Sequence, residues 1–232
     1  MPAIILVGGG SSSGKSYLMK AVTEALGPER VTLLTLDDYY KDQADMSMEE
    51  RLAVNYDHPN AFDWRLMRQQ IKALKDGQTI EKPTYDFKLR TRAERTEVIV
   101  PKDLIVVEGI MALVDRQLRE LGDVRVFIQA SAERRFLRRM VRDIKERGRT
   151  MESVVAQYFA TVQPMYDEIV KPSSIYADLI VNNDGVANLA VDVLTVVFNQ
   201  QLEKATRGQL QKRVMTEEFT DEVFASLLTK DE

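Results

Sequence analysis

A glycine-rich segment near the start of the chain holds the residues best suited to chemistry. Residues 9–16 fit the pattern G-x-x-x-x-G-K-[ST], which cradles phosphate groups. Glycines allow the backbone to turn tightly and to present successive N–H groups to phosphate oxygens. Lys15 adds a positive charge, and Ser16 adds a hydroxyl for Mg2+. The pattern predicts a nucleotide phosphate site made of Gly9, Gly10, Ser11, Ser12, Ser13, Gly14, Lys15 and Ser16.

Two carboxylates follow strand-like apolar runs. Asp37 ends the run at 31–36, and Glu108 ends the run at 104–107. Open α/β sheets bind ligands at the carboxyl ends of their strands, so this placement favours a site over an ordinary solvated turn. A carboxylate directly after a buried strand, in a chain with a phosphate loop, is typical of a residue that helps to hold Mg2+. Glu108 is therefore a candidate magnesium ligand.

A helix predicted from Ser131 onward separates apolar from basic residues. At 100° per residue, one face gathers Phe136, Leu137, Met140, Val141 and Ile144, and the other gathers Arg134, Arg135, Arg138, Arg139 and Arg142. A charged helix face is usually solvated, and we expect this for most of these arginines. A few of them can clamp triphosphate oxygens, because a planar guanidinium binds phosphate through two N–H groups. Periodicity does not identify which arginines do so.

The elements that must position these residues alternate along the chain. Strand-like runs at 3–7, 31–36, 104–107, 124–128 and 177–181 alternate with helical patterns at 16–26, 64–75, 131–144, 151–170 and 187–202. This alternation predicts an α/β fold with a parallel five-stranded sheet and helices on both faces. The runs at 79–87 and 96–101 are too close for a helical crossover, so we expect an antiparallel hairpin lid over about 78–101. Pro164 should bend the helix at 151–170.

Composition excludes several classes of protein. The net charge of −4 argues against bulk attraction to nucleic acid, and no cysteine is present for disulfide or thiolate chemistry. The apolar runs are too short to cross a bilayer, and the first of them leads directly into the glycine loop, as a buried strand does and a signal peptide does not. We expect a cytoplasmic protein. The only histidine, His58, precedes a proline and has no His or Cys neighbour, so we expect a structural role for it.

Seven motifs together resemble the uridine kinases (uridine-cytidine kinases), P-loop nucleoside kinases of the phosphoribulokinase/uridine kinase family. The resemblance runs from residue 4 to about residue 192. It rests on Gly-Gly-Gly-Ser-Ser-Ser-Gly-Lys-Ser at 8–16, Asp-Asp-Tyr-Tyr-Lys-Asp at 37–42, Asn-Tyr-Asp-His-Pro-Asn-Ala-Phe-Asp at 55–63, Tyr-Asp-Phe at 85–87, Val-Glu-Gly-Ile at 107–110, Arg-Asp-Ile-Lys-Glu-Arg-Gly-Arg at 142–149 and Ala-Gln-Tyr at 156–158.

The resemblance implies a P-loop kinase domain, which we expect over residues 1–202. From residue 203 to 232 the chain turns polar and charged, and we expect this extension to form a short amphipathic helix or to fray. The resemblance also implies transfer of the γ-phosphate of ATP (or GTP), with Mg2+, to the 5′-hydroxyl of uridine or cytidine in pyrimidine salvage. Small-molecule partners are then a nucleoside and a nucleotide, and a homo-oligomer (dimer or tetramer) and feedback by pyrimidine triphosphates are also suggested. Carried onto this sequence, the family's residues are Asp37 as catalytic base with Lys15; Ser16, Asp37 and Glu108 at Mg2+; Arg142 and Arg147 at ATP; and Asp37, Tyr40, Tyr56, Asp57, Tyr85, Phe87, Arg90, Arg139, Arg149 and Gln157 at the substrate.

Departures from the family pattern concern the acceptor. Arg90 stands where the family usually has a histidine that contacts the base, and an arginine can only donate hydrogen bonds. This predicts a preference for uridine over cytidine if Arg90 faces the base. The alternatives are that Arg90 points to solvent or meets an anionic substrate. Asp38 replaces a common serine, and residues 182–184 replace a proline-led turn.

Three other functions compete with a uridine kinase. A kinase for another nucleoside or a small hydroxyl substrate such as a sugar phosphate would share the phosphate loop. A non-catalytic nucleotide sensor would be expected to lack some catalytic positions, yet Lys15, Ser16, Asp37 and Glu108 are all present. The arginine helix could suggest RNA binding, but the net negative charge and the lack of a nucleic-acid-binding motif argue against it.

Overall fold

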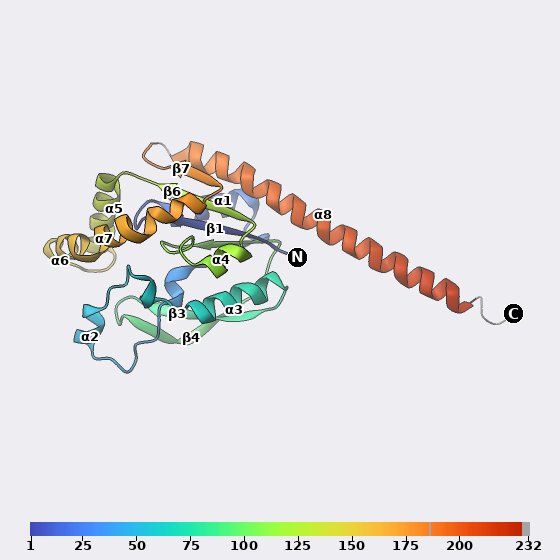
Figure 1. Ribbon diagram of the computed structural model, residues 1–232, viewed down its shortest axis with the longest axis horizontal. Coiled ribbons are helices and arrows are strands. Elements are labelled where there is room, and N and C mark those ends of the chain that lie inside the picture. Colours follow the sequence, from blue (N-terminus) through green and yellow to red (C-terminus); the bar gives the residue numbers. More distant parts are fainter. Residues whose placement is uncertain (186, 229–232) are drawn as a thin grey trace.

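A parallel five-stranded sheet forms the centre of the protein (Figure 1), in a computed structural model that describes residues 1–185 and 187–228, with residues 187 and 209–228 described by their backbone alone. The strands are β1 (Ala3–Gly9), β2 (Val31–Thr35), β5 (Leu104–Glu108), β6 (Val124–Gln129) and β7 (Leu179–Asn182), in the order β2-β5-β1-β6-β7. Every pairing within this sheet is parallel. The predicted fold class is therefore confirmed, and β1, which precedes the phosphate loop, lies in the middle.

Helices cover both faces of the sheet, as its continuous apolar strands require. On one face, α1 (Lys15–Leu26) and the start of α8 (Ala187–Leu228) pack through Leu18, Leu194 and Phe198. On the other face, α3 (Trp64–Lys75) and α4 (Arg116–Leu121) pack through Ile71 and Leu118. Alternate residues of β1 enter these two cores, and this holds the carboxyl end of β1 in a fixed position.

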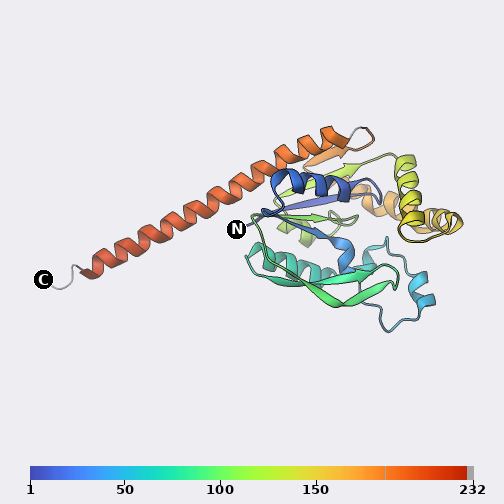
Figure 2. The same ribbon diagram turned by 180° about the vertical axis from the view of Figure 1, so that it is seen from behind.

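The predicted hairpin is present as β3 (Ile80–Asp86) and β4 (Thr91–Ile99), a separate antiparallel pair beside α3 (Figures 1 and 2). The expectation that its second strand begins at residue 96 was wrong, because β4 begins at Thr91. Thr91 and Arg92 carry polar side chains that bind the body of the protein: Thr91 bonds to Asp42, and Arg92 bonds to Asp63 and the Tyr40 carbonyl. Because these residues are polar, the start of the strand has no apolar pattern from which it could be predicted.

Helix α5 (Ala132–Lys145) corrects a second expectation, that its arginine face is mostly solvated. Arg135 and Arg139 are only 3% and 6% exposed, whereas Leu137 and Val141 on the apolar face are 57% and 54% exposed. The helix turns its basic face toward the phosphate loop and its apolar face outward. Periodicity shows which residues share a face but not which face points inward. Buried guanidiniums are tolerated here because carbonyls, an aromatic ring and a carboxylate surround them.

The helical segment after α5 is irregular. It comprises α6 (Met151–Gln157), a wide π-helical turn (Tyr158–Val162), α7 (Gln163–Met165) and a second wide turn (Tyr166–Val170). Pro164 has no N–H group and cannot make the regular backbone hydrogen bond within a helix, which accounts for the break in the regular pattern near α7.

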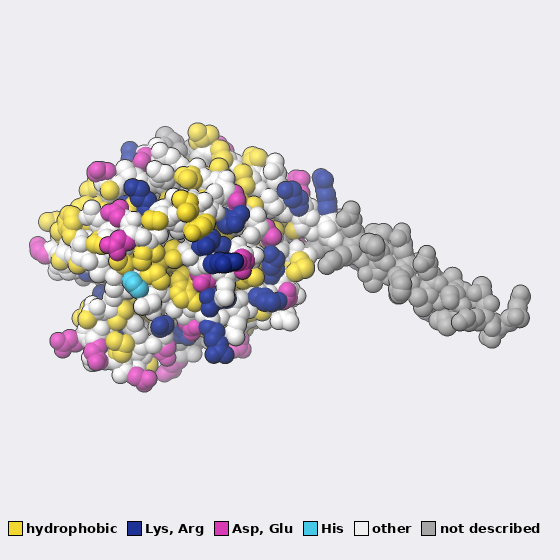
Figure 3. All heavy atoms as spheres, viewed as in Figure 1, with side chains coloured by type: hydrophobic (Ala, Val, Ile, Leu, Met, Phe, Trp, Pro, Cys, Tyr) yellow, Lys and Arg dark blue, Asp and Glu magenta, His cyan; other side chains and the backbone are white. Residues whose placement is uncertain are grey.

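Apolar side chains gather at this end of the molecule, and the surface is hollowed between α6 and α2 (Met48–Ala53) (Figure 3).

Helix α8 is longer than predicted. The apolar helix was expected to end at residue 202, but α8 continues to Leu228 and projects from the body (Figures 1 and 2). Helix α2, with its Ser47–Glu50 capping box, was not predicted. Across the described residues, no helix combines the length and the apolar character that crossing a membrane requires.

Candidate active site

The phosphate loop connects β1 to α1. Its Gly14 has φ 95°, a left-handed conformation, and a Cβ at this position would lie 2.2 Å from Nδ2 of Asn183. Gly10 is equally constrained, because a Cβ there would lie 2.8 Å from a guanidinium nitrogen of Arg135. Gly14 is therefore required by its backbone conformation and its neighbour, and Gly10 by its close neighbours alone. Asn183 donates from Nδ2 to the Ser13 carbonyl at 2.8 Å and so holds the loop to the end of β7.

Lys15 and Ser16 begin α1 and face the carboxyl end of β5. Lys15 Nζ donates to the Gly9 and Gly10 carbonyls at 2.8 and 3.0 Å, and Ser16 Oγ donates to Glu108 Oε1 at 2.7 Å. Burial lowers the pKa of Lys15, although Glu108 and Asp37 oppose this. Burial raises the pKa of Glu108, although the charge of Lys15 opposes it. The two charges influence each other, but Lys15 is bound by loop carbonyls and Glu108 by Ser16.

A cavity opens over this loop; we call it the donor cavity, because the phosphate loop would hold the phosphate donor there. Its lining joins the loop to the ends of β2 and β5 and to one face of α5: Ser11, Ser12, Gly14, Lys15, Ser16, Tyr17, Thr35, Asp37, Glu108, Gly109, Ile110, Arg138, Arg142, Glu146 and Arg147. Mg2+ prefers oxygen ligands and is usually bound by one or two carboxylates together with phosphates and water. Ser16, Glu108 and Asp37 offer such oxygens beside the phosphate loop, so these residues fit a nucleotide-bound magnesium ion.

A second cavity of about 300 Å³, the acceptor cleft, adjoins the donor cavity. All ten residues predicted to bind the substrate line it: Asp37, Tyr40, Tyr56, Asp57, Tyr85, Phe87, Arg90, Arg139, Arg149 and Gln157. The other lining residues are Ser11, Lys88, Ile110, Arg142 and Arg147. The cleft thus brings together residues that are distant in the sequence.

Asp37 lies where the two cavities meet. It is in the helical turn Leu36–Tyr39 directly after β2, and it lines both cavities, as do Arg142 and Arg147. Burial raises the pKa of Asp37, and the positive charges of Lys15, Arg147 and Arg142 oppose that rise. A carboxylate that lies between a phosphate loop and a second cleft, among cations, is placed to accept a proton from a hydroxyl in that cleft.

The wall of the acceptor cleft combines aromatic rings with one buried carboxylate. Tyr40 packs against Tyr85 and Tyr56 with ring centroids 5.1 and 5.3 Å apart. Asp57 is 7% exposed; burial raises its pKa, and Arg139 opposes this rise. Flat rings and a buried hydrogen-bond acceptor suit a ligand that has both an aromatic and a hydroxyl part.

His58, just after this carboxylate, has a structural contact: its Nδ1 accepts a hydrogen bond from the Asn60 N–H at 3.0 Å and so caps the following turn.

Arg90 lines the cleft from the hairpin. It is partly buried, and its guanidinium carbon lies 5.7 Å from the centre of the Tyr56 ring. Its φ of 52° is left-handed, which turns the side chain at the tip of the hairpin. Arg147 lies over the Phe87 ring at 5.0 Å. The hairpin therefore contributes both aromatic and cationic groups to the cleft.

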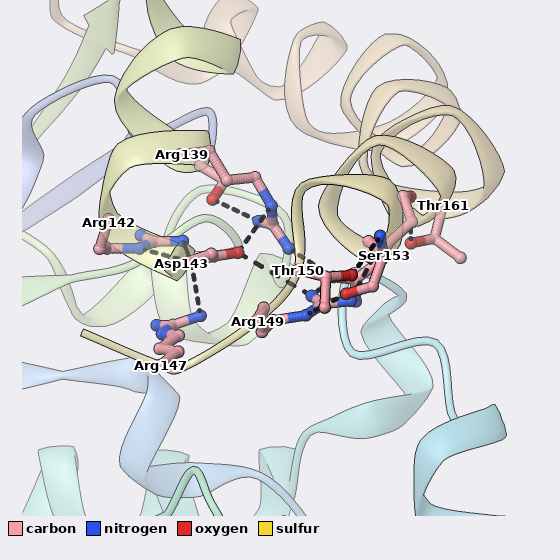
Figure 4. A network of polar contacts seen from close by, with 10 residues as sticks. Arg139, Arg142, Asp143, Arg147, Arg149, Thr150, Ser153 and Thr161 are labelled. Carbon is pink, nitrogen blue, oxygen red and sulfur yellow. Dashed lines mark hydrogen bonds and ion pairs between the residues drawn. The ribbon is translucent and has the colours of Figure 1, made fainter. Parts of the chain in front are cut away.

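Four arginines surround one carboxylate at the end of α5 (Figure 4). Asp143 is fully buried and lies within ion-pair distance of Arg139, Arg142, Arg147 and Arg149. Arg139 also donates to Ser11 Oγ at 2.8 Å, and Arg149 donates to Gln157. Sequence reasoning missed Asp143, although it lies four positions after Arg139 on the same face of α5.

Three predicted site residues line neither cavity: Gly9, Gly10 and Ser13. Their role is in the backbone of the loop, since the carbonyls of Gly9 and Gly10 bind Lys15. Two supports of the loop were not predicted. Arg138 donates to the Ser13 and Asn183 carbonyls, and the Arg135 guanidinium stacks on Tyr166 at 3.5 Å behind Gly10. No local motif marks such long-range contacts in the sequence.

Comparison with known proteins relates the whole kinase-like body to one group. The chain is 50% identical over 194 residues to the uridine kinase of Lactiplantibacillus plantarum, covering 84% of this chain and 93% of that protein. It is 47% identical over 200 residues to the uridine kinase of Macrococcus caseolyticus, covering 86% and 97%.

Solved structures agree in fold. Phosphoribulokinase from Rhodobacter spheroides superposes with a TM-score of 0.57 at 13% identity, covering 78% of this chain and 70% of that one. D-glycerate 3-kinase from Cryptococcus neoformans superposes with a TM-score of 0.57 at 19% identity, covering 78% and 86%. The sequence profile of the Phosphoribulokinase / Uridine kinase family matches residues 4–190. The chain therefore belongs to the phosphoribulokinase/uridine kinase family.

Proposed function

We propose that the protein transfers the γ-phosphate of ATP to the 5′-hydroxyl of uridine. The observation that carries this proposal is the position of Asp37, which lines both the donor cavity over the phosphate loop and the adjoining acceptor cleft. Relatives of 50% and 47% identity are uridine kinases, and the alignments cover more than four-fifths of this chain. GTP can serve as an alternative donor, because the phosphate loop binds the phosphates and not the base.

In this proposal, a few residues have separate roles in phosphoryl transfer. Asp37 accepts the proton of the acceptor hydroxyl as its oxygen bonds to the γ-phosphorus and the bond from that phosphorus to the leaving ADP breaks. Lys15, Arg142 and Arg147 line the donor cavity, and their positive charges offset the negative charge of the phosphate oxygens. Ser16 and Glu108, with Asp37, would hold Mg2+, which when bound neutralises charge on the phosphates. Alignment and charge neutralisation are the main requirements of this reaction.

The acceptor cleft suits a nucleoside. Asp57 can accept hydrogen bonds from the ribose hydroxyls, and Tyr56, Tyr85 and Phe87 provide rings for the base. Arg90 lines the same cleft and can only donate hydrogen bonds. Uridine presents a carbonyl at base position 4 and cytidine an amino group, so we infer a preference for uridine.

A second acceptor class follows from the charge of the cleft. Lys88, Arg90, Arg139, Arg142, Arg147 and Arg149 line it, against the two carboxylates Asp37 and Asp57. This excess of cations would also attract an anionic acceptor such as a sugar phosphate. The aromatic wall and Asp57 favour the nucleoside, because a sugar phosphate has no base to pack against the rings.

A single assay separates these candidates. ADP release would be followed with uridine, cytidine, purine nucleosides and sugar phosphates, each at several concentrations. We expect the highest kcat/KM with uridine. A higher kcat/KM for a sugar phosphate, or ATP binding with no transfer to any acceptor, would contradict the proposed function.

Assembly and location in the cell are two further parts of the proposal. We infer that the protein self-associates, since Leu137 and Val141 expose apolar surface on α5, and such patches are typical of protein–protein contacts. We also infer a cytoplasmic enzyme with a kinase domain over 1–202 and a C-terminal extension over 203–232. Sedimentation of the full chain tests the first inference, and a single monomeric species at micromolar concentration would contradict it.

A further inference from the structure

Asp143 is the one buried carboxylate within the described part of the chain that contacts four arginines. Its side chain is 0% exposed at the end of α5. Oδ1 lies 2.9 Å from Arg142 Nη2 and 3.5 Å from Arg147 Nη1. Oδ2 lies 3.4 Å from Arg139 Nε and 3.9 Å from Arg149 Nη1. Figure 4 shows the carboxylate at the centre of the four guanidiniums.

The two oxygens serve different parts of the site. Arg142 and Arg147, which contact Oδ1, line both the donor cavity and the acceptor cleft. Arg139 and Arg149, which contact Oδ2, line the acceptor cleft alone. One rigid group therefore fixes the position of the cations on the phosphate side relative to those on the acceptor side.

The positive charges of the four arginines explain why a carboxylate is required among them. Four guanidiniums around one point repel each other, and a single carboxylate leaves a net charge of about three positive units among these five groups. Much of this excess remains for an anionic ligand. Burying a carboxylate is costly unless it is paired with opposite charge. Oδ1 accepts a hydrogen bond from Arg142 Nε at 2.9 Å, whereas Oδ2 has only the longer ion-pair contacts with Arg139 and Arg149.

We propose that Asp143 is a positioning residue for phosphoryl transfer: it holds Arg142 and Arg147 in register with Arg139 and Arg149, and so aligns the transferred phosphate with the acceptor hydroxyl. The inference rests on the proposed function, because it assigns the donor and acceptor sides to the two cavities. Asp143 itself lines neither cavity, so its effect acts through the arginines.

The test replaces Asp143 by Asn, which keeps the shape but turns an amide N–H₂ toward guanidinium donors. Three quantities are measured on the full chain: kcat with the best acceptor, the dissociation constant of a non-hydrolysable ATP analogue, and the melting temperature. We expect kcat to fall at least 10-fold, about 1.4 kcal/mol in the barrier. Nucleotide binding should stay within about 3-fold of wild type, because the phosphate loop and Lys15 are unchanged. A change in kcat without loss of binding distinguishes misalignment from unfolding.

Asp167→Asn is the matched control, since Asp167 is exposed on the second wide turn and lines neither cavity. It should leave kcat unchanged. If Asp143→Asn does not fold, Asp143→Glu replaces it: the charge is kept, but the added methylene displaces the carboxylate, and kcat should again fall about 10-fold with binding retained. Wild-type kcat in a folded Asp143 variant, or equal losses of kcat and nucleotide binding, would overturn the inference. Failure of the wild type to phosphorylate any acceptor would instead refute the proposed function.

Discussion

Replacing Arg90 by His should weaken the discrimination between uridine and cytidine. Arg90 lines the acceptor cleft with its guanidinium near the Tyr56 ring, and its five N–H groups can only donate. A neutral histidine can donate or accept, so it can meet either the carbonyl of uridine or the amino group of cytidine. Histidine also tolerates left-handed backbone better than most residues, and the φ of 52° at this position should be kept.

The expected magnitude is that of one mismatched hydrogen bond in a partly buried site. Such a mismatch costs roughly 1–3 kcal/mol, and the lower half of this range applies because Arg90 is partly exposed. At about 1.4 kcal/mol, kcat/KM of the wild type should favour uridine by about 10-fold. Arg90→His should reduce that ratio to about 1–3. The assay is kcat/KM for both nucleosides, measured by ADP release with ATP saturating.

A matched control is Arg95→His in strand β4, which follows Arg90 directly in the hairpin. Arg95 is exposed and lines neither cavity, so the substitution should leave the nucleoside ratio unchanged. Equal kcat/KM for uridine and cytidine in the wild type would refute the reasoning, because Arg90 would then not contact the base. An unchanged ratio in Arg90→His would refute it as well.

Three further changes test other parts of the site. Glu108→Gln should raise the Mg2+ concentration needed for half-maximal activity about 10-fold or more, since one carboxylate ligand is lost, and unchanged Mg2+ dependence would exclude Glu108 from the metal site. Asn183→Ala removes the bond to the Ser13 carbonyl and should lower the free energy of unfolding by about 1–3 kcal/mol in urea titrations, against no change for the exposed Asn188→Ala. Because burial raises the pKa of Asp37, kcat/KM should fall with decreasing pH at a higher pH than for a free aspartate, and a pH-independent acid range would contradict this.

The raised pKa of Asp37 also predicts a trade between stability and activity. A carboxyl with a raised pKa in the folded state stabilises the fold below its usual pKa, and this contribution is lost as the pH rises through the folded-state value. At neutral pH the ionised Asp37 therefore opposes folding. Asp37→Asn should raise the melting temperature at pH 7, and a lower melting temperature would show that the carboxylate has a stabilising partner in the folded protein.

The sequence predicted the sheet well because each of its strands is a short apolar run. β1 and β5 are buried on both sides of the sheet, so their composition alone identifies them. β4 was predicted too short, since Thr91 and Arg92 bind Asp42 and Asp63 through polar side chains. Strand prediction from apolar pattern fails where a strand is held by side-chain hydrogen bonds.

The orientation of α5 could not be predicted from its periodicity. The helix is strongly amphipathic, and the usual rule would turn Leu137 and Val141 inward. Arg139 is buried instead, because Asp143, Gln157 and Ser11 bind its guanidinium. Only Asp143 among these three lies on the same helix, so most of the information is distant in the sequence.

The site itself was predicted through motifs, and its supports were not. The substrate residues carried over from the family all line one cleft. Asn183, Arg138 and Tyr166 reach the phosphate loop from segments more than a hundred residues away, and single side chains carry no pattern that marks such contacts. Motifs mark residues that line a cavity more readily than residues that hold those residues in place.

The central claim is that Asp37 is the base at the junction of the donor and acceptor sites. The most direct measurement is ADP release with uridine for the wild type and Asp37→Asn, together with binding of a non-hydrolysable ATP analogue to both. The structure predicts that Asp37→Asn loses at least 100-fold in kcat, within the range of about 10²–10⁴ that general-base catalysis contributes, and still binds the analogue. Turnover close to that of the wild type in a variant that binds ATP would contradict the account.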